Sequence, residues 1–432
     1  MKKIVCLVGK PNGGKSSIFN RLIKEDKAII ADTPGITRDR LYGNVNYDNY
    51  NFILIDTGGI EATGEDNIKT QSLIAVEEAD VILFVVDGKK ELTKDDYLIR
   101  DILRKAHKKV IVVVNKLDNT KVSDNIYNYY ELGFEKVLGV SAAHNIGFNS
   151  LLGELTEDFK EEVEEELEIP KFCIIGRPNV GKSSLVNALL NESRVVVSES
   201  AGTTRDAVDT KFKYNHNDYI IIDTAGMRKK GKIGEDIEKY SLIRSLRAID
   251  RSDVCVIVLS AQDGVIEHDK HITSYALGAG KAVVLCVNKW DALEEKNVKN
   301  WQLLIRSEFQ FVPYVAIVFL SAKTKKGLGS LMPEVLNAYN NHHKEIKTSL
   351  LNKIIENATA LHEAPSYKGK RLKIYFAHQE GVKPPKFTFT VNNKGLVHFS
   401  YHRYLENQIR ENIDLTGTPV ILKFKNKGNK DE

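Results

Sequence analysis

The sequence is poor in cysteine. Only four cysteines, Cys6, Cys173, Cys255 and Cys286, occur in 432 residues, and each lies within a short apolar run. No two of them have the spacing of metal ligands, so we expect buried core thiols and neither a disulfide framework nor a cysteine-bound metal. A reducing cytoplasm permits this use of cysteine, and the predicted location is cytoplasmic.

Long hydrophobic runs are also missing. The apolar runs, such as Val81 to Val86 and Val312 to Leu320, have the length of strands, far below the roughly 20 residues that a helix needs to cross a bilayer. The chain begins Met-Lys-Lys-Ile and enters its first apolar run directly, which predicts that no signal peptide is present. We therefore expect no membrane span.

Most of the chain lacks an excess of positive charge. The net charge is +4, but residues 342–432 hold 16 Lys and Arg against 9 Asp and Glu, a balance of +7, so residues 1–341 sum to −3. The hydrophobic share of 42% and the charged share of 28% are ordinary for a soluble protein, and the length allows about three domains. The basic character therefore belongs to the C-terminal domain.

A glycine-rich pattern of eight residues occurs twice, 167 residues apart. Each copy follows an apolar, β-branched run and precedes a helix-like stretch, which is the context of a phosphate-binding loop. The glycines let backbone N–H groups turn toward a phosphate, the lysine adds charge, and the serine offers a hydroxyl to magnesium. The loops comprise Gly9, Lys10, Pro11, Asn12, Gly13, Gly14, Lys15 and Ser16 in the first copy and Gly176, Arg177, Pro178, Asn179, Val180, Gly181, Lys182 and Ser183 in the second.

Two further motifs repeat at the same offset. Thr37-Arg38-Asp39 matches Thr204-Arg205-Asp206, and Asp56-Thr57-Gly58-Gly59 matches Asp223-Thr224-Ala225-Gly226. Each aspartate of the second motif ends an apolar run, where a magnesium ion needs a hard oxygen ligand. The threonines are candidates for switch segments that complete the metal shell when a γ-phosphate is present. The predicted magnesium ligands are Ser16, Thr37 and Asp56 in the first copy and Ser183, Thr204 and Asp223 in the second.

A third pair of motifs predicts the base. Asn115-Lys116-Leu117-Asp118 corresponds to Asn288-Lys289-Trp290-Asp291, and the turns Ser141-Ala142 and Ser321-Ala322 follow in the same order. A carboxylate at the base edge accepts from N1–H and from the exocyclic amine of guanine, whereas adenine has no donor at either position. Asn-Lys-x-Asp seen once is an ordinary polar turn. Two copies, each after an apolar run, favour two guanine-specific sites.

The residue that commonly orients the attacking water is missing from both copies. Many small GTPases have a glutamine after Asp-x-x-Gly, but Ile60 and Met227 stand here, and neither side chain can hydrogen-bond water. Three interpretations stay open: a slow timer that awaits a partner's catalytic group, a site that uses a monovalent cation, or a site without turnover. Asn12 and Asn179 are suitably placed to bind a potassium ion, so we hypothesise potassium-stimulated hydrolysis. The predicted catalytic residues are Lys15, Lys182, Thr37, Thr204, Asn12 and Asn179.

The two copies are not identical within their loops. Gly13 stands where the second copy has Val180, and Ile36 stands where it has Thr203. The glycine adds backbone freedom beside the phosphates, which slightly raises the cost of ordering the first loop.

The combined pattern resembles a known family. Tandem Pro-Asn-x-Gly-Lys-Ser loops and Thr-Arg-Asp switches are followed by Pro384-Pro385-Lys386-Phe387 and by Ser400-Tyr-His-Arg-Tyr-Leu-Glu-Asn407. Over nearly the whole chain this resembles the bacterial double-Era-like GTPases, the Der or EngA family. The resemblance implies two Ras-like α/β domains packed around a KH-like domain, and a cytoplasmic role in late assembly of the large (50S) ribosomal subunit. It further implies that the nucleotide state of the sites rearranges the domains and gates binding to the ribosome.

The expected fold is therefore two tandem Ras-like P-loop GTPase domains followed by a C-terminal α+β KH-like domain. We expect the first at residues 1–156, an acidic linker at 157–168, the second at 169–343, the KH-like domain at 344–426 and a tail at 427–432. Alternating segments at Arg371 to Phe376 and Lys386 to Val391 predict strands of the last domain. Residues 345–432 contain no Gly-x-x-Gly, the loop that clamps a nucleic-acid backbone. This domain either holds ribosomal RNA through its phosphates or docks on the second GTPase domain.

Other functions explain the motifs less completely. A tRNA-modifying GTPase needs a second catalytic apparatus, and no cysteine is left outside the apolar runs to serve it. A scaffold that binds GTP as a structural ligand predicts no turnover. Single Era-type GTPases act on the small subunit, but the duplication argues against that reading. The expected partners are the 50S subunit and its rRNA, without DNA, for a protein that is a monomer by default.

Overall fold

The computed structural model divides into two compact units. The described residues from Lys3 to Phe159 form the first unit, and those from 169 to 427 form the second. The structure describes residues 3–25, 42–47, 50–59, 72–73, 76, 79–118, 120–157, 159, 169–191, 195–197, 209–223, 245–364, 366–367 and 370–427.

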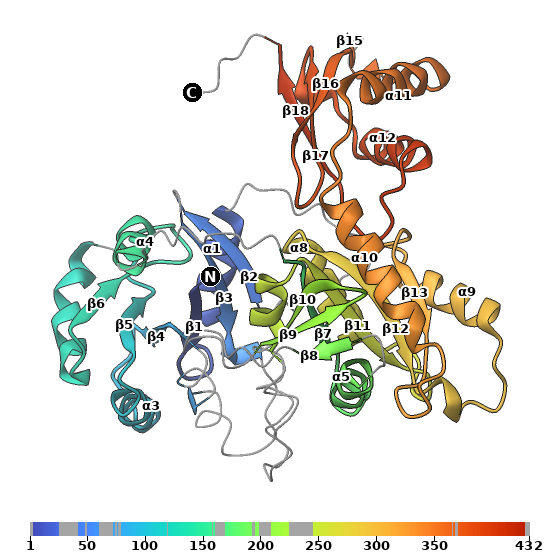
Figure 1. Cartoon of the computed structure of the whole chain (residues 1–432). Helices are drawn as coiled ribbons and strands as arrows, with labels where there is room; N and C mark the ends of the chain where they lie inside the picture. Colours follow the sequence, from blue (N-terminus) through green and yellow to red (C-terminus); the bar gives the residue numbers. More distant parts are fainter. Residues whose placement is uncertain are drawn as a thin grey trace. The chain divides into compact units, whose positions relative to one another are not determined.

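The first unit is built on a six-stranded sheet in the order β2-β3-β1-β4-β5-β6 (Figure 1). β2 and β3 form an antiparallel pair, and the remaining neighbours are parallel. The central strands read as continuous apolar runs because both faces of a parallel sheet are covered. The strands are β1 (Lys3–Val8), β2 (Tyr42–Tyr47), β3 (Tyr50–Asp56), β4 (Val81–Asp87), β5 (Lys109–Asn115) and β6 (Lys136–Gly139).

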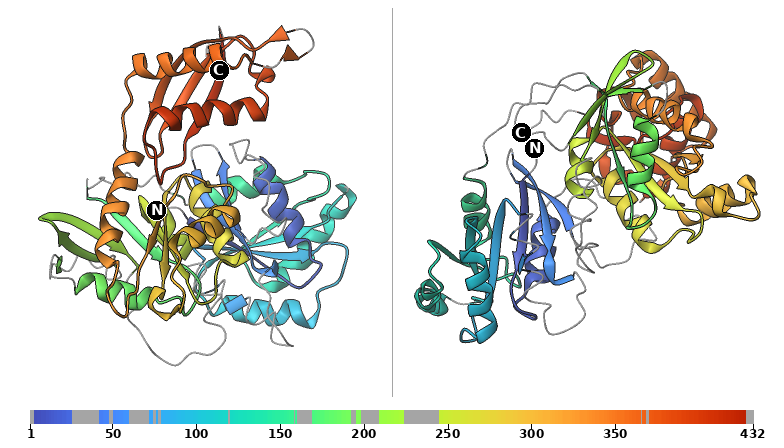
Figure 2. Two further views of the ribbon diagram at one scale, coloured as in Figure 1. Left: turned by 90° about the vertical axis from the view of Figure 1, so that its right-hand side faces the viewer. Right: turned by 60° about the horizontal axis from the view of Figure 1, so that its bottom comes forward.

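Helices cover both faces of this sheet (Figures 1 and 2). Leu7 and Phe52 share one core cluster with Ile18 and Leu22 of α1 and with Leu151 of α4, so these two helices pack on the same face. The opposite face is covered by α3 (Figure 1). The helical elements of this unit are α1 (Lys15–Glu25), η1 (Thr57–Gly59), α3 (Lys94–Arg104), η2 (Thr120–Leu132) and α4 (Phe148–Thr156).

The second unit repeats this topology in a seven-stranded sheet, in the order β13-β12-β11-β7-β10-β9-β8. β8 extends the edge beyond the order found in the first unit. Its strands are β7 (Lys171–Ile175), β8 (Val195–Val197), β9 (Thr210–Tyr214), β10 (Asn217–Ile222), β11 (Val254–Ser260), β12 (Ala282–Asn288) and β13 (Ala316–Phe319). Its helical elements are α5 (Lys182–Leu190), α8 (Glu267–Gly278), η3 (Trp290–Ala292), α9 (Val298–Glu308), η4 (Leu328–Ser330) and α10 (Leu331–His342).

The C-terminal part of the second unit is a separate α+β layer. Its three-stranded sheet pairs β16 antiparallel and β18 parallel with the central β17, and helices α11 and α12 share the core cluster beneath it. β17 lies where the sequence predicts it, whereas β16 begins at Ile374, later than predicted, because Arg371 pairs within a separate two-stranded ribbon. The elements are α11 (Thr348–Leu361), β14 (Ser366–Tyr367), β15 (Lys370–Arg371), β16 (Ile374–Gly381), β17 (Lys386–Val391), η5 (Lys394–Leu396), α12 (Phe399–Asn412) and β18 (Ile421–Asn426).

This layer docks on the sheet and on α10 of the same unit. Val283 N–H donates to the Gly417 carbonyl at 2.7 Å, and Gly417 N–H donates to the Tyr314 carbonyl at 3.0 Å. The Arg410 guanidinium lies 3.6 Å from the centroid of the Tyr314 ring. His342 Nδ1 is 2.8 Å from the Thr418 hydroxyl, and burial lowers the pKa of His342 to about 3, so the imidazole is neutral at physiological pH. The C-terminal domain therefore docks on the second GTPase domain through specific hydrogen bonds, which is one of the two expectations for it.

The predicted fold class is confirmed: two α/β sandwiches with the same strand topology precede the α+β layer. The four cysteines are free and buried, as predicted. In the described part of the chain, none of the helices combines the length and apolar character needed to span a bilayer.

Candidate nucleotide-binding sites

The glycine-rich loops join β1 to α1 and β7 to α5, at the carboxyl ends of central strands. Gly14 and Gly181 have left-handed backbones with φ of 92° and 97°. A Cβ atom at Gly14 would lie 2.1 Å from Asn115 Nδ2, and one at Gly181 would lie 2.3 Å from Asn288 Nδ2. Only glycine satisfies both the conformation and the close approach. Each loop is thus shaped by an asparagine from a distant strand.

The loop lysines point back into their own loops. Lys15 Nζ donates to the carbonyls of Gly9 at 2.6 Å and Lys10 at 2.9 Å, and Lys182 Nζ donates to those of Gly176 and Arg177, both at 2.7 Å. Burial lowers the pKa of Lys182 to about 8. Burial also lowers the pKa of Lys15, but the Asp56 carboxylate opposes that shift. An anion inside either loop would stabilise the buried ammonium group.

Serine and aspartate meet beside the first loop. Ser16 Oγ donates to Asp56 Oδ2 at 2.7 Å, and Gly58 N–H donates to Asp56 Oδ1 at 2.9 Å. Thr57 Oγ1 donates to the Leu7 carbonyl at 2.6 Å, which fixes the start of η1. A hydroxyl and a carboxylate at this separation are hard oxygen donors of the kind that magnesium prefers, so the residues fit that ion.

The corresponding aspartate of the second copy is placed differently. Asp223 follows β10 with a left-handed φ of 58°, and its N–H donates to Asp209 Oδ1 at 3.0 Å. Asp209 is in turn paired with Arg251. Several predicted site residues lie outside the described residues: Thr37, Ile60, Thr204, Thr224, Ala225, Gly226 and Met227.

Asn115 and Asn288 connect three segments of each site. Asn115 Nδ2 donates to the Gly13 carbonyl at 3.3 Å, while its Oδ1 accepts from Ala142 N–H at 3.2 Å. Asn288 Nδ2 donates to the Val180 carbonyl at 2.8 Å, while its Oδ1 accepts from Ala322 N–H at 2.9 Å. The same bonds therefore join the Asn-Lys-x-Asp segment to the phosphate loop and to the Ser-Ala turn in both copies.

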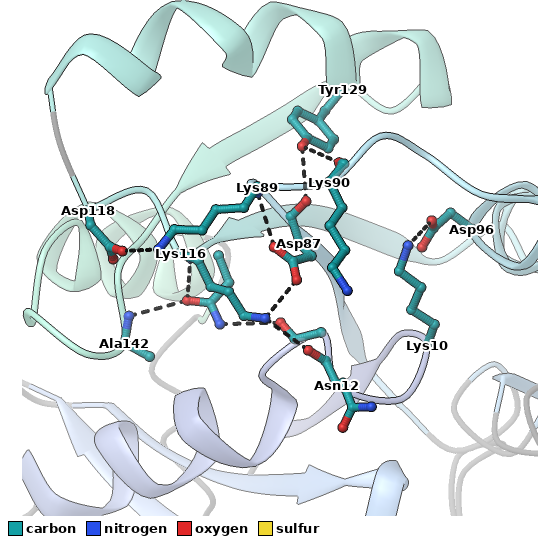
Figure 3. A network of polar contacts seen from close by, with 12 residues as sticks. Lys10, Asn12, Asp87, Lys89, Lys90, Asp96, Lys116, Asp118, Tyr129 and Ala142 are labelled. Carbon is teal, nitrogen blue, oxygen red and sulfur yellow. Dashed lines mark hydrogen bonds and ion pairs between the residues drawn. The ribbon is translucent and has the colours of Figure 1, made fainter.

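The base end of the first site is a network of charged side chains (Figure 3). Lys116 has a left-handed φ of 71°, and its Nζ reaches the Asn12 carbonyl at 3.1 Å and Asp87 Oδ2 at 2.6 Å. Asp118 Oδ2 lies 2.5 Å from Lys89 Nζ, and its Oδ1 accepts from the Ser141 hydroxyl at 2.8 Å. The hydrogen bond from Lys89, followed by that from Ser141, lowers the pKa of Asp118. In the second copy the Ser321 hydroxyl is the main cause that lowers the pKa of Asp291.

Two buried acids beside the loops were missed in the sequence. Lys10 Nζ lies 2.6 Å from Asp96 Oδ2, and Arg177 Nε lies 3.7 Å from Asp269 Oδ1. Asp96 and Asp269 are fully buried, and each accepts a backbone N–H at the start of its helix, α3 or α8. Both acids lie on the third residue of a helix, at one offset of 173 residues, and this repeated spacing is the signal that could have found them. The side chains of Lys10 and Arg177 are therefore directed to these acids.

Comparison with known proteins places these domains in a family. A family model described as "50S ribosome-binding GTPase" matches residues 4–116 and 171–289, and one described as "KH-domain-like of EngA bacterial GTPase enzymes, C-terminal" matches residues 345–425. GTPase Der of Staphylococcus carnosus is 48% identical over 428 residues, covering 98% of this chain and 98% of that protein. GTPase Der of Oceanobacillus iheyensis is 49% identical over 428 residues, with the same coverage. A crystal structure of Era in complex with MgGDPNP and nucleotides 1506–1542 of 16S ribosomal RNA covers 60% of this chain and 93% of that chain, at 22% identity and a TM-score of 0.31, too low to compare domain arrangements.

Proposed function

The chain belongs to the GTPase Der family, and from this membership we propose that it assists maturation of the large (50S) ribosomal subunit, with the nucleotide state of its two sites gating binding to that subunit. As a member of this family it is a GTP-hydrolysing P-loop enzyme. The description of the family model that matches both GTPase domains supports the choice of the large subunit. We propose residues 1–156, 169–343 and 344–426 as the functional domains.

The assignment of two guanine sites rests on one observation: in both copies an asparagine joins the phosphate loop to the Ser-Ala turn. Asn115 and Asn288 each hold a loop carbonyl and the N–H of a Ser-Ala turn, and each is followed by an aspartate at the base end. In this proposal Asp118 and Asp291 accept from the guanine N1–H and exocyclic amine. The loop amides and Lys15 or Lys182 neutralise the phosphates, which is the main contribution of such sites to phosphoryl transfer.

Magnesium fits the oxygen donors beside the first loop. Ser16 and Asp56 would hold it there, directly or through water, and Ser183 and Asp223 would do so in the second copy. When bound, the ion neutralises charge that develops between the β- and γ-phosphates. Thr37 and Thr204 are proposed to complete the shell in the GTP state.

Potassium is the proposed second cation. Asn12 and Asn179 have left-handed backbones, with φ of 63° and 61°, at the tips of their loops. An amide oxygen at this place would help to hold a monovalent cation, which would supply positive charge to the phosphates in sites that lack the usual glutamine. Turnover in KCl should exceed turnover in NaCl, and Asn12→Ala and Asn179→Ala should each remove the difference at one site. Equal turnover in both salts for the unmodified chain would contradict the potassium hypothesis.

We propose that the exposed face of the C-terminal sheet contacts ribosomal RNA. Phe376 pairs through Thr390 with Lys425, and His378 pairs through Thr388 with Lys423, so these side chains lie in two rows on one face. The rings of Phe376 and His378 are stacked at 5.8 Å, and Phe376 is 46% exposed. Exposed aromatic rings stack on unpaired bases, and lysines bind phosphates.

Co-sedimentation with 30S, 50S and 70S particles tests the ribosomal role. Binding should be selective for 50S and should depend on GMPPNP rather than GDP, and Lys15→Ala or Lys182→Ala should abolish that dependence. The double variant Lys423→Gln with Lys425→Gln should weaken binding and reduce its salt dependence. Exchange of Lys347→Gln and Lys353→Gln, two exposed lysines at the start of α11 and within it, is the matched control. Absence of selective binding in every nucleotide state would contradict the proposal.

A further inference from the structure

Lys89 forms an ion pair with Asp118, the carboxylate that is proposed to bind the base in the first site. Its Nζ is 2.5 Å from Asp118 Oδ2 (Figure 3). Ser141 donates to Oδ1, so both oxygens of Asp118 are engaged. Guanine needs both carboxylate oxygens, because N1–H and the exocyclic amine donate side by side. The ammonium group of Lys89 therefore holds an acceptor that the base requires.

The backbone places Lys89 there through the ends of two neighbouring strands. Asp87 of β4 pairs in register with Asn115 of β5, and Gly88 N–H donates to the Asn115 carbonyl at 2.7 Å. Lys89 N–H donates to Asp87 Oδ1 at 3.0 Å, and Tyr129 Oη donates to the Asp87 carbonyl at 3.1 Å. The turn that carries Lys89 is thus fixed, whereas its side chain is 58% exposed and can leave the carboxylate.

The second copy keeps this backbone but has no lysine at the position of Lys89. At the offset of 173 residues, Ala261 N–H donates to the Asn288 carbonyl at 2.9 Å, as Gly88 does in the first copy. The residue in the place of Lys89 is Gln262. The side chain of Asp291 is bonded mainly by the Ser321 hydroxyl, with Lys323 and Lys296 acting only at longer range. Among the described residues, a lysine therefore contacts the base-reading carboxylate of the first site, whereas the lysines near Asp291 act on it only at longer range.

We propose that Lys89 is an internal competitor of guanine in the first site, so that this site binds guanine nucleotides more weakly and discriminates guanine less sharply than it would with a neutral residue. This inference rests on the proposed guanine sites. The ring of His144 also lies near Asp118, but its Nε2 is 3.9 Å from Oδ1, so it does not contact the oxygen that Lys89 holds. Because the pair is partly exposed, the competition is modest and weakens with salt.

The test measures the affinity of the first site alone. In the full chain carrying Lys182→Ala, Lys89→Gln should tighten binding of a fluorescent GDP by roughly threefold to fivefold at low salt, and the gain should shrink at high KCl. The gain should be smaller for inosine diphosphate, because inosine lacks the exocyclic amine and needs fewer acceptors. Lys89→Arg keeps the charge and should leave GDP affinity near that of the unmodified residue.

The second copy supplies a reciprocal test. In the chain carrying Lys15→Ala, Gln262→Lys should weaken GDP binding at the second site by a similar factor. Unchanged or weaker GDP binding in Lys89→Gln would overturn the inference while leaving the proposed sites intact. If the Lys182→Ala chain showed no GDP binding that Lys15→Ala removes, the proposed guanine site would fail and the inference would fail with it.

Discussion

The two GTPase copies keep the hydrogen bonds that shape the phosphate loop and differ in the charged side chains at the base end of the site. Lys15 and Lys182 donate to equivalent loop carbonyls at 2.6 to 2.9 Å, and the asparagine bridges use the same atoms. At the base end, Asp87 and Lys89 of the first copy are replaced by Ser260 and Gln262 in the second. Duplication has kept the backbone hydrogen bonds and changed the charges beside them, so the same contacts can operate with different affinities.

The base-reading carboxylates should show the largest effect. Asp118→Asn and Asp291→Asn each replace an acceptor with a donor amide, so GDP affinity at the altered site should fall by roughly a hundredfold or more, as expected for loss of charge-assisted hydrogen bonds. The loss should be smaller at the first site, because Lys89 already occupies one oxygen there. The amide should also accept xanthine nucleotides, whose C2 carbonyl can receive its N–H.

Titration of fluorescent GDP and XDP into the two single-site chains measures these changes. Asp101→Asn, which alters a carboxylate 57% exposed on α3, serves as the matched control. Equal losses at both sites would argue that Lys89 exerts no competition. No loss at either site would remove the assignment of these aspartates to the base.

The buried acids beside the loops should give the next largest effect, on stability. Asp96 has no exposed surface and pairs with Lys10 at 2.6 Å, so Asp96→Ala removes the charge partner of a largely covered ammonium group and leaves the start of α3 without its acceptor. We expect a loss of roughly 2 to 4 kcal/mol in the free energy of unfolding of the first domain. Asp269 is 3.7 Å from Arg177, which also pairs with Asp263 at 3.2 Å, and burial raises the pKa of Asp269. Asp269→Ala should therefore cost less, roughly 1 to 2 kcal/mol.

Denaturant unfolding of the full chain, followed by domain-specific hydrogen exchange, separates the two domains. Asp95→Ala, beside Asp96 on α3, is the control for helix propensity. A larger loss for Asp269→Ala than for Asp96→Ala would contradict the ranking of the two pairs.

The local parts of these sites could be predicted from the sequence, and the parts formed across strands could not. The loops, the aspartate that ends β3, the one that follows β10, and the two Asn-Lys-x-Asp segments are contiguous patterns that follow apolar runs. The contacts of Lys89 with Asp118 and of Lys10 with Asp96 join residues 29 and 86 positions apart. They depend on which strand ends are neighbours and on rotamers that no local pattern encodes.

The C-terminal domain shows the same limit. Alternating polar and apolar residues predict its central strand correctly. The predicted start of β16 is wrong, because Arg371 pairs with Ser366 in a separate two-stranded ribbon. Gly417 is left-handed, with φ of 82°, and a Cβ there would lie 2.7 Å from Ala338 Cβ on α10. That requirement comes from docking, so an isolated glycine in the sequence could not reveal it.

The pH dependence of nucleotide affinity should differ moderately between the two phosphate loops. Burial lowers the pKa of Lys182 to about 8, and a bound phosphate stabilises the ammonium and raises that pKa. Binding above about pH 8 then requires proton uptake, so affinity at the second site should be constant below that pH and fall by up to tenfold per pH unit above it. At the first site Asp56 opposes the effect of burial, so the fall should begin at a higher pH.

Titration of fluorescent GDP into the Lys15→Ala and Lys182→Ala chains, from about pH 7 to about pH 9.5, gives both curves. Lys182→Arg, whose guanidinium stays charged over this range, should flatten the curve of the second site even where its affinity is lower. A fall that begins at lower pH in the first site would reverse the assigned order.

Substitution of Gly13, the residue before Gly14 and Lys15, should have the smallest effect. Gly13 has no left-handed φ, and a Cβ there would meet Lys10 O at 3.4 Å and Val85 O at 3.6 Å, which are ordinary contacts. Gly13→Ala should therefore fit, as Val180 does in the second copy, and stabilise the first domain by roughly 0.4 to 1 kcal/mol through the unfolded chain. Gly14→Ala is the contrasting control, because its Cβ would lie 2.1 Å from Asn115 Nδ2. Denaturant unfolding should show opposite signs for the two changes, and a destabilised Gly13→Ala would mean that the first loop uses its extra backbone freedom.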